Sequence, residues 1–491
     1  MSVTSATRTA LIALASFTAV SHIEAQTLAR PGWVGSGLSA QSWSKHAVLY
    51  EIDTRSFQDT NADGIGDLKG ITRHLDYIQS LGADAILLEP LQSATPGAHP
   101  NPIDPALGTT DDFDELSLQA SRHNLRLLLE LPEADPALAR FWLTRGIAGF
   151  YIPTPSNPGA PHPDSEMWES NLKAIRKLLA GYTGQRILIT DSDLATTPSK
   201  SSPAKSASAK STASELLLDP ALLKLPSAST SITADLRTAL EHSQTLLRSG
   251  TPALVTALVT DSLALPRSLN RFAPNETAAH QADIARILAA VLLLNRSVSV
   301  IYAGQELGLS SPTGSPVMIP WGIPPAPAPT EQPDQPEKPA PPPSNSEAYV
   351  PYVAPVVKHP AKPVPPDPAT ASGQDQIPGS MLDFYRQLIQ LHHGKTAVRD
   401  GEQIVLNHDD VNALIWVRKP PAPSLQNPAI VIVCNLSAKP IDLPLKAELT
   451  RLKLRGSFLK TILRSDDAMG SMHLEPATVP PFSAFIGELR Y

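Results

Sequence analysis

A short stretch near the start of the chain constrains the fold most, because it joins a strand pattern, an oxygen-rich loop and a helix pattern. The apolar run Ala47–Ile52 lies between polar residues and predicts a buried strand. Behind the loop, apolar residues recur at helical spacing: Leu68, Ile71, Leu75, Ile78 and Leu81. A second apolar run, Ala85–Leu88, follows. Strand, helix and strand in this order form the unit of parallel α/β sheets and barrels.

The same alternation continues along the chain. Eight strand-like segments are expected at 47–52, 85–88, 125–129, 149–152, 186–191, 216–218, 253–259 and 298–302. Eight strands with their helices over about 260 residues match the size of a (β/α)8 TIM barrel. The sequence therefore predicts an α/β fold of this kind.

Side-chain oxygens alternate along the loop between the first strand and the first helix. Asp59, Asn61 and Asp63 stand at every second position, and glycines next to them allow a tight turn. Such a set of hard oxygen donors suits a cation such as Ca²⁺. The alternative is an Asx- and Gly-rich turn that holds no metal.

Two stretches lack the periodicity of helices and strands. Residues 194–214 are rich in Ser, Ala, Thr and Lys and predict a flexible insertion. Residues 321–379 are dense in proline, which blocks helix and sheet interiors, and predict a linker. Beyond this linker, a helix is expected at 381–391, and strands at 411–417, 429–433 and 481–489. The last part therefore predicts an all-β domain.

Composition excludes some classes of partner. With a formal net charge of −7, the chain gives no reason to expect nucleic acid or an anionic membrane surface. A single cysteine, Cys434, excludes an internal disulfide, and its apolar neighbours predict a buried thiol.

The first residues resemble an export signal. Arg8 supplies the positive charge, residues 10–20 the apolar segment, and Ala25 a small residue at the cleavage site. This run is too short to span a membrane, so we expect an exported, periplasmic or secreted protein that is cleaved near Ala25.

Three motifs carry a resemblance to a known family. Tyr50–Phe57 reads YEIDTRSF, and the oxygen-rich loop follows directly. Ile103–Thr109 reads IDPALGT, and Ile301–Gly308 reads IYAGQELG. Together they resemble the α-amylase family, glycoside hydrolase family 13, and especially its oligo-1,6-glucosidase and trehalose-synthase-like branch.

The resemblance implies a division of the chain and a set of ligands. The division is a signal peptide at 1–25, a barrel at 43–320, a Pro-rich linker at 321–379, and a helix with a β-sandwich domain at 380–491. A structural Ca²⁺ is implied, held by Asp59, Asn61, Asp63, Asp67 and the carbonyl of Ile65. An α-glucan or oligosaccharide is the implied ligand. The small domain that the family inserts after strand three is missing, because only a few residues separate this strand from its helix.

The positions of the family's catalytic groups are altered. A retaining glycosidase needs a nucleophilic carboxylate and a carboxylic acid across the scissile bond. Here Tyr151 replaces the arginine beside the nucleophile, and Pro153 replaces the nucleophile itself. Asp191 occupies the position of the general acid, with a side chain one methylene shorter. The third carboxylate and its neighbouring histidine are replaced by Ala264 and Leu263.

Other carboxylates lie at predicted strand ends, namely Asp53, Glu89, Glu130, Asp191 and Asp193. They could form a rebuilt acid/base pair or a second metal site. The interpretation that we favour from sequence is that they are solvated loop residues.

The main hypothesis is therefore an exported α-amylase-family protein of carbohydrate metabolism that is catalytically impaired or inactive and binds glucan. One alternative is an active α-glucosidase or transglycosidase with a rearranged carboxylate pair. The other is a protein-interaction scaffold that uses the Pro-rich segment.

Overall fold

The computed structural model describes residues 43–92, 102–154, 165–191, 214–223, 231–249, 255–263, 265–322, 365–407, 409–466 and 468–491. Several predicted features lie outside this part of the chain: the signal peptide, the insertion at 194–213, most of the Pro-rich stretch, Asp193 and Ala264.

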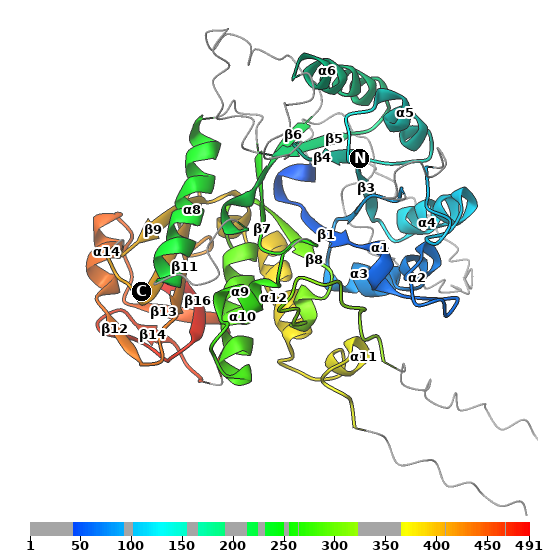
Figure 1. Cartoon of the computed structure of the whole chain (residues 1–491). Coiled ribbons are helices and arrows are strands. Elements are labelled where there is room, and N and C mark those ends of the chain that lie inside the picture. The colour runs from blue at the N-terminus through cyan, green and yellow to red at the C-terminus, as the bar shows by residue number, and fades with distance from the viewer. Residues whose placement is uncertain are drawn as a thin grey trace, which may run out of the picture. The chain divides into compact units, whose positions relative to one another are not determined.

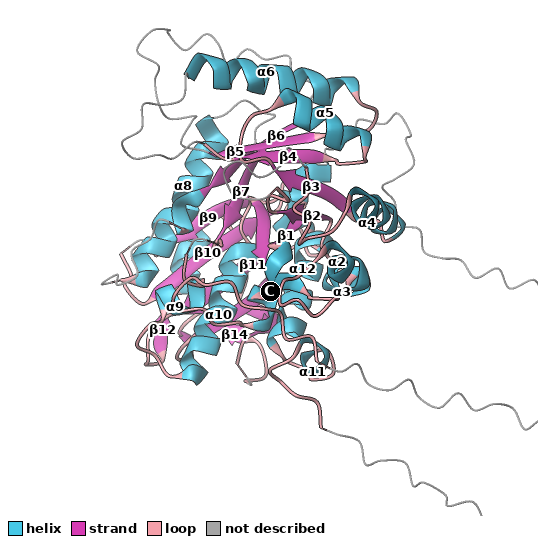
Figure 2. Cartoon of the chain, turned by 45° about the vertical axis from the view of Figure 1, so that its right-hand side comes forward, coloured by secondary structure: helices cyan, strands magenta, loops and turns pink. Residues whose placement is uncertain are grey.

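Eight parallel strands form a closed barrel (Figures 1 and 2). They are β1 (Val48–Ile52), β2 (Ala85–Leu88), β3 (Arg126–Glu130), β4 (Gly149–Ile152), β5 (Ile187–Asp191), β6 (Ser214–Asp219), β7 (Val255–Val259) and β8 (Val298–Tyr302). Each strand pairs with the next one in the chain, and β8 pairs with β1, where Glu51 stands opposite Tyr302. The predicted TIM barrel is confirmed.

Helices follow most of these strands, as a parallel barrel requires. They are α1 (Thr54–Phe57), α2 (Leu68–Arg73), α3 (Leu75–Leu81), α4 (Thr110–Arg122), α5 (Pro136–Thr144), α6 (Ser165–Gly181), α8 (Ile232–Ser249), α9 (Ser268–Phe272) and α10 (Ala278–Leu293). Three short 3-10 helices are η1 (Trp43–His46), η2 (Pro220–Leu222) and η3 (Gln305–Leu307).

The chain passes from β3 to α5 through five residues, which leaves no room for an inserted domain. The helix begins here because Asp135 accepts the backbone N–H groups of Ala137 and Leu138, and Pro136 occupies the first turn. The predicted absence of the inserted domain is confirmed.

The interior of the barrel is filled by alternate residues of the strands. Leu49, Leu87 and Leu128 belong to this inner apolar cluster, whereas their sequence neighbours pack outward against the helices. Side chains alternate between the two faces of a strand, so the residue two positions after each of these leucines also points inward. These positions carry the candidate site described below.

The C-terminal domain consists of two antiparallel sheets, with strand orders β14-β13-β16-β11-β10-β9 and β12-β15. The strands are β9 (Glu402–Leu406), β10 (Ala413–Lys419), β11 (Ile430–Asn435), β12 (Ile441–Leu443), β13 (Phe458–Arg464), β14 (Met472–His473), β15 (Ala477–Val479) and β16 (Ser483–Arg490). The helix α14 (Leu445–Arg451) packs on them through Leu445 and Leu449. Cys434 is fully buried, as predicted.

The barrel and the C-terminal domain belong to one compact unit. Trp416 and the fully buried Arg418 both donate to the carbonyl of Leu294, at the end of α10 (3.2 and 3.0 Å). Arg418 also donates to the carbonyls of Val398 and Gly401. One guanidinium therefore satisfies three backbone carbonyls where the two parts of the unit meet.

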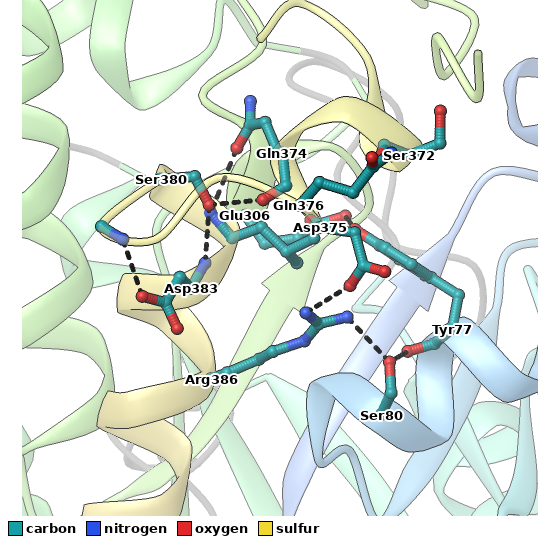
Figure 3. Close-up of polar contacts among 12 residues, drawn as sticks. Tyr77, Ser80, Glu306, Ser372, Gln374, Asp375, Gln376, Ser380, Asp383 and Arg386 are labelled. Atoms are coloured by element: carbon teal, nitrogen blue, oxygen red, sulfur yellow. Dashed lines mark hydrogen bonds and ion pairs between the residues drawn. The ribbon is translucent and has the colours of Figure 1, made fainter. Parts of the chain in front are cut away.

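The end of the predicted linker differs from expectation. Residues 365–379 include the short helix α11 (Ala371–Gln374), which precedes α12 (Met381–Gly394) and α13 (Thr396–Asp400). Figure 3 shows the contacts: Arg386 donates to Asp375 and to Ser80 of α3 (2.6 and 2.9 Å). In this part of the predicted linker, Gln374 accepts the N–H of Leu382 at the start of α12 and donates to the carbonyl of Leu307 after β8. No helix in the described ranges is both long and apolar enough to cross a bilayer.

Candidate functional site

Three glutamates face inward at the carboxyl end of the barrel. Glu51, Glu89 and Glu130 lie two residues after Leu49, Leu87 and Leu128, so they share the inward parity of those leucines. Glu89 follows β2 directly, and its N–H donates to the carbonyl of Ile52 (3.0 Å). Because β1, β2 and β3 are neighbours, the glutamates form a row along one side of the opening, which we call the mouth row.

Two tyrosines extend the mouth row on either side. Tyr302 of β8 is the register partner of Glu51, and Tyr151 of β4 is the register partner of Glu130. The Tyr302 side chain lowers the pKa of Glu89, which places it next to this carboxyl group. The inward positions at this end are therefore polar, in contrast to the apolar positions beneath them.

The three glutamates of the mouth row do not readily ionise together. Burial and then the charge of Glu130 raise the pKa of Glu51 well above its usual range. Burial and then Glu51, Asp53 and Glu130 raise the pKa of Glu89 in the same direction. Burial, followed by the charge of Asp191, raises the pKa of Glu130 to about 7. Like charges close together in a poorly solvated site favour the protonated form.

One buried cation faces this row. The guanidinium of Arg267 lies 4.4 Å from the ring centroid of Tyr302, and its charge lowers the pKa of Glu51. Its Nη2 donates to the carbonyl of Ala303 (2.8 Å), whereas its Nη1 is buried without a hydrogen-bond partner. Arg267 is also the last residue of the segment that carries the altered third-carboxylate motif.

The sequence interpretation that the strand-end carboxylates are solvated was wrong for Asp53 and Glu89. They are 6% and 7% exposed, so they are not solvated loop residues. Asp53 Oδ1 accepts the N–H of Arg55 (3.1 Å), but its Oδ2 is buried and has no partner. The structure thus brings Asp53, Glu89, Glu130 and Asp191 to the same end of the barrel.

The ends of β4 and β5, where the family resemblance leads us to expect the nucleophile and the acid, are joined by hydrogen bonds. Asp191 Oδ1 accepts the hydroxyl of Tyr151 (2.9 Å), and its Oδ2 accepts the N–H of Thr154 (2.7 Å). Pro153, between these two donors, carries no side-chain heteroatom. Both oxygens of Asp191 therefore tie β5 to the end of β4.

Sequence reasoning missed Glu51, Arg267 and Asp261. Asp261, after β7, is 1% exposed and accepts both the N–H and the hydroxyl of Ser268. Glu51 was not among the candidates at the predicted strand ends, although its spacing from Leu49 places both residues on the same strand face. Leu263, at the family's histidine position, is 38% exposed.

A further buried carboxylate at this end is fully paired. Glu306, after β8, accepts the hydroxyls of Tyr50 and Tyr77 (2.8 and 2.7 Å) and the N–H of Gly304 (2.9 Å). Figure 3 shows Glu306 and Tyr77 side by side. This carboxylate serves the fold, in contrast to the mouth row.

The oxygen-rich loop closes on itself. Asp59 accepts the N–H groups of Asn61, Ala62 and Gly64, and these bonds, that of Gly64 above all, lower the pKa of Asp59. Asp67 caps α2 by accepting the N–H of Gly70. Ala62 and Gly64 have positive φ angles (65° and 89°), as the tight turn requires.

The donor chemistry of this loop suits a hard cation, since every candidate ligand is an oxygen. Asp63 accepts the N–H of Ile65 (2.8 Å) and the side-chain amide of Asn61 (3.0 Å). No three acidic, histidine or cysteine side chains converge as a metal site among the described residues. The oxygen donors of the loop therefore suit Ca²⁺, although its carboxylates do not converge on one point in this structure.

The described residues form a (β/α)8 barrel followed by a C-terminal all-β domain. Residues 51–132 match the family described as alpha amylase, catalytic domain. The trehalose-6-phosphate hydrolase of Escherichia coli (strain K12) is 36% identical over 131 residues, 24% of each chain. The trehalose synthase/amylase TreS of Mycolicibacterium smegmatis is 31% identical over 184 residues, 35% of this chain and 28% of that protein. The matched segments span about a quarter of these relatives.

Solved structures extend the likeness of fold beyond this segment. The isomaltulose synthase of Klebsiella sp. LX3 superposes with a TM-score of 0.64 at 17% identity, covering 92% of this chain and 100% of that chain. The resemblance to the α-amylase family is thus confirmed for residues 51–132, and the solved structures extend the likeness of fold to most of the chain.

Proposed function

We propose that this chain is an α-amylase-type barrel that binds an α-glucoside or oligosaccharide without cleaving it by the family's mechanism. The observation that carries the proposal is the pairing at the ends of β4 and β5. Pro153 provides no nucleophile, and both oxygens of Asp191 are engaged by Tyr151 and Thr154. Retaining hydrolysis needs a free carboxylate and a proton donor at these positions.

Calorimetric titration of the full chain with maltotriose, isomaltotriose and trehalose tests this proposal, with product analysis of the same samples. We expect binding of at least one sugar and no product. Release of glucose by the pure protein would contradict the proposal.

A second candidate, an active α-glucosidase or transglycosidase, is supported by the mouth row. A carboxyl group with a pKa of about 7, such as Glu130, suits a general acid at neutral pH. If product is found and Glu130→Gln abolishes it, while Glu133→Gln in the loop that follows β3 does not, this candidate replaces the first.

We also propose that the loop binds one structural Ca²⁺ through Asp59, Asn61, Asp63, Asp67 and the carbonyl of Ile65. The alternating oxygens and the positive φ angles of the turn support this. When bound, the ion would stabilise the connection between β1 and α2. Export with cleavage near Ala25 stays a prediction, as does the role of the Pro-rich segment in protein binding, since both concern residues outside the described ranges.

A further inference from the structure

The mouth row holds more carboxyl groups than cations. Glu51, Glu89, Glu130 and Asp53 act on one another, yet one guanidinium, that of Arg267, is the cation that acts on this group in the described part of the chain. The charge of Asp261 also raises the pKa of Glu51, but Asp261 has partners of its own, since it accepts from Ser268 and acts on Arg271. Asp191 is satisfied by Tyr151 and Thr154.

An unpartnered atom points to a missing ligand at the same place. Asp53 is 94% buried, its Oδ2 has no hydrogen-bond partner, and its charge acts on both Glu89 and Tyr302. A buried acceptor without a donor costs about 1–3 kcal/mol by general experience, so native proteins rarely keep one without a reason. A ligand that donates hydrogen bonds would satisfy this oxygen.

The surroundings favour an organic cation over a metal ion. The described side chains offer no convergent set of three acidic, histidine or cysteine ligands. The ring of Tyr302 already holds a guanidinium at 4.4 Å, which shows that this end of the barrel accommodates a planar or soft cation against an aromatic face. A protonated amine has three donors that can be shared among several carboxylates.

We propose that the mouth row, with Asp53, binds a small ligand that carries a protonated primary amine. The expected ligand is an amino sugar. The amine is inferred from the mouth row, whereas the sugar portion rests on the proposed function. The ammonium group lies at the mouth row, and one of its N–H groups donates to the unpartnered Oδ2 of Asp53.

Binding should release protons at neutral pH. The glutamates are held in the protonated form by burial and by one another, and an ammonium ion among them favours ionisation. The released protons make the observed heat depend on the ionisation enthalpy of the buffer. A neutral sugar in the same place has no such effect.

The test is calorimetric titration of the full chain at pH 7 in two buffers of different ionisation enthalpy, with D-glucosamine, D-glucose and ethylammonium chloride as probes. We expect glucosamine to bind at least about tenfold more tightly than glucose, with proton release. Glu130→Gln, which keeps the size of the side chain, should weaken glucosamine binding about tenfold or more and reduce the proton release. Glu133→Gln is the matched control, because Glu133 is an exposed carboxylate three residues further along the chain, in the loop after β3.

The outcomes separate this inference from the proposed function. Equal affinity for glucose and glucosamine without proton release overturns the inference and leaves the sugar-binding proposal standing. Binding of ethylammonium and glucosamine, but of no neutral oligosaccharide, supports the ammonium site and overturns the proposed function. If Glu130→Gln remains folded by circular dichroism and binds glucosamine like the wild type, the assignment to the mouth row is wrong; Glu89→Gln repeats the test if Glu130→Gln does not fold.

Discussion

Replacing Glu130 by glutamine should change how the stability of the protein depends on pH. Burial and the charge of Asp191 raise the pKa of Glu130 from 4.5 to about 7 in the folded chain. Below pH 4.5 the carboxyl group is protonated in both the folded and the unfolded states. As the pH rises, the unfolded chain ionises first, so stability is lost progressively until about pH 7. A difference of about 2.5 pKa units corresponds to about 3 kcal/mol.

Glutamine imitates the protonated form and cannot ionise. Wild type and Glu130→Gln should therefore have similar free energies of unfolding near pH 4.5, and the variant should be more stable by about 3 kcal/mol at pH 8. Urea unfolding at half-unit steps from pH 4.5 to pH 8 measures this difference. The exposed Glu133→Gln should follow the wild type throughout. Parallel curves for wild type and Glu130→Gln would refute the electrostatic reasoning about the mouth row.

Three other changes follow from the contacts. Asp63→Ala should abolish the rise in melting temperature that Ca²⁺ gives over chelator; calorimetry that shows the same rise in both proteins contradicts the calcium proposal. Asp191→Ala should destabilise the protein by about 1–3 kcal/mol, because Tyr151 and Thr154 lose their acceptor; an unchanged urea midpoint would show that these bonds contribute nothing. Arg418→Ala should destabilise by at least about 3 kcal/mol, since the carbonyls of Leu294, Val398 and Gly401 lose their buried donor; a smaller loss in urea unfolding means that water replaces the guanidinium.

The barrel was predictable because its strands are buried on both faces. Such strands appear in sequence as continuous apolar runs, and those at 85–88, 149–152 and 298–302 coincide with β2, β4 and β8. The ends of β6 and the packing of 365–379 were harder, because residues of mixed polarity there are ordered by contacts with distant elements. Gln374, for example, donates to the carbonyl of Leu307 (2.9 Å), which lies 67 residues away.

The mouth row could be predicted only in part. Glu89 and Glu130 were candidates because they end apolar runs, and Asp53 because it follows one. Glu51 lies inside its strand, where a run that is apolar on both faces gives no sign of which residues point inward. The pairing of the strands supplies that information, through the inner cluster that contains Leu49 and through the register of Glu51 with Tyr302.

Tyr151 of β4 connects Glu130 of the mouth row, on β3, with Asp191 on β5. Glu130 and Tyr151 are register partners, Tyr151 donates to Asp191, and the charge of Asp191 in turn raises the pKa of Glu130. A tyrosine in place of the arginine expected from the family resemblance leaves the negative charge of Asp191 acting on Glu130, two strands away in the barrel. If the two proposals above are correct, the same change at the end of β4 prevents hydrolysis by the family's mechanism and helps to keep a proton on Glu130 that a cationic ligand would displace.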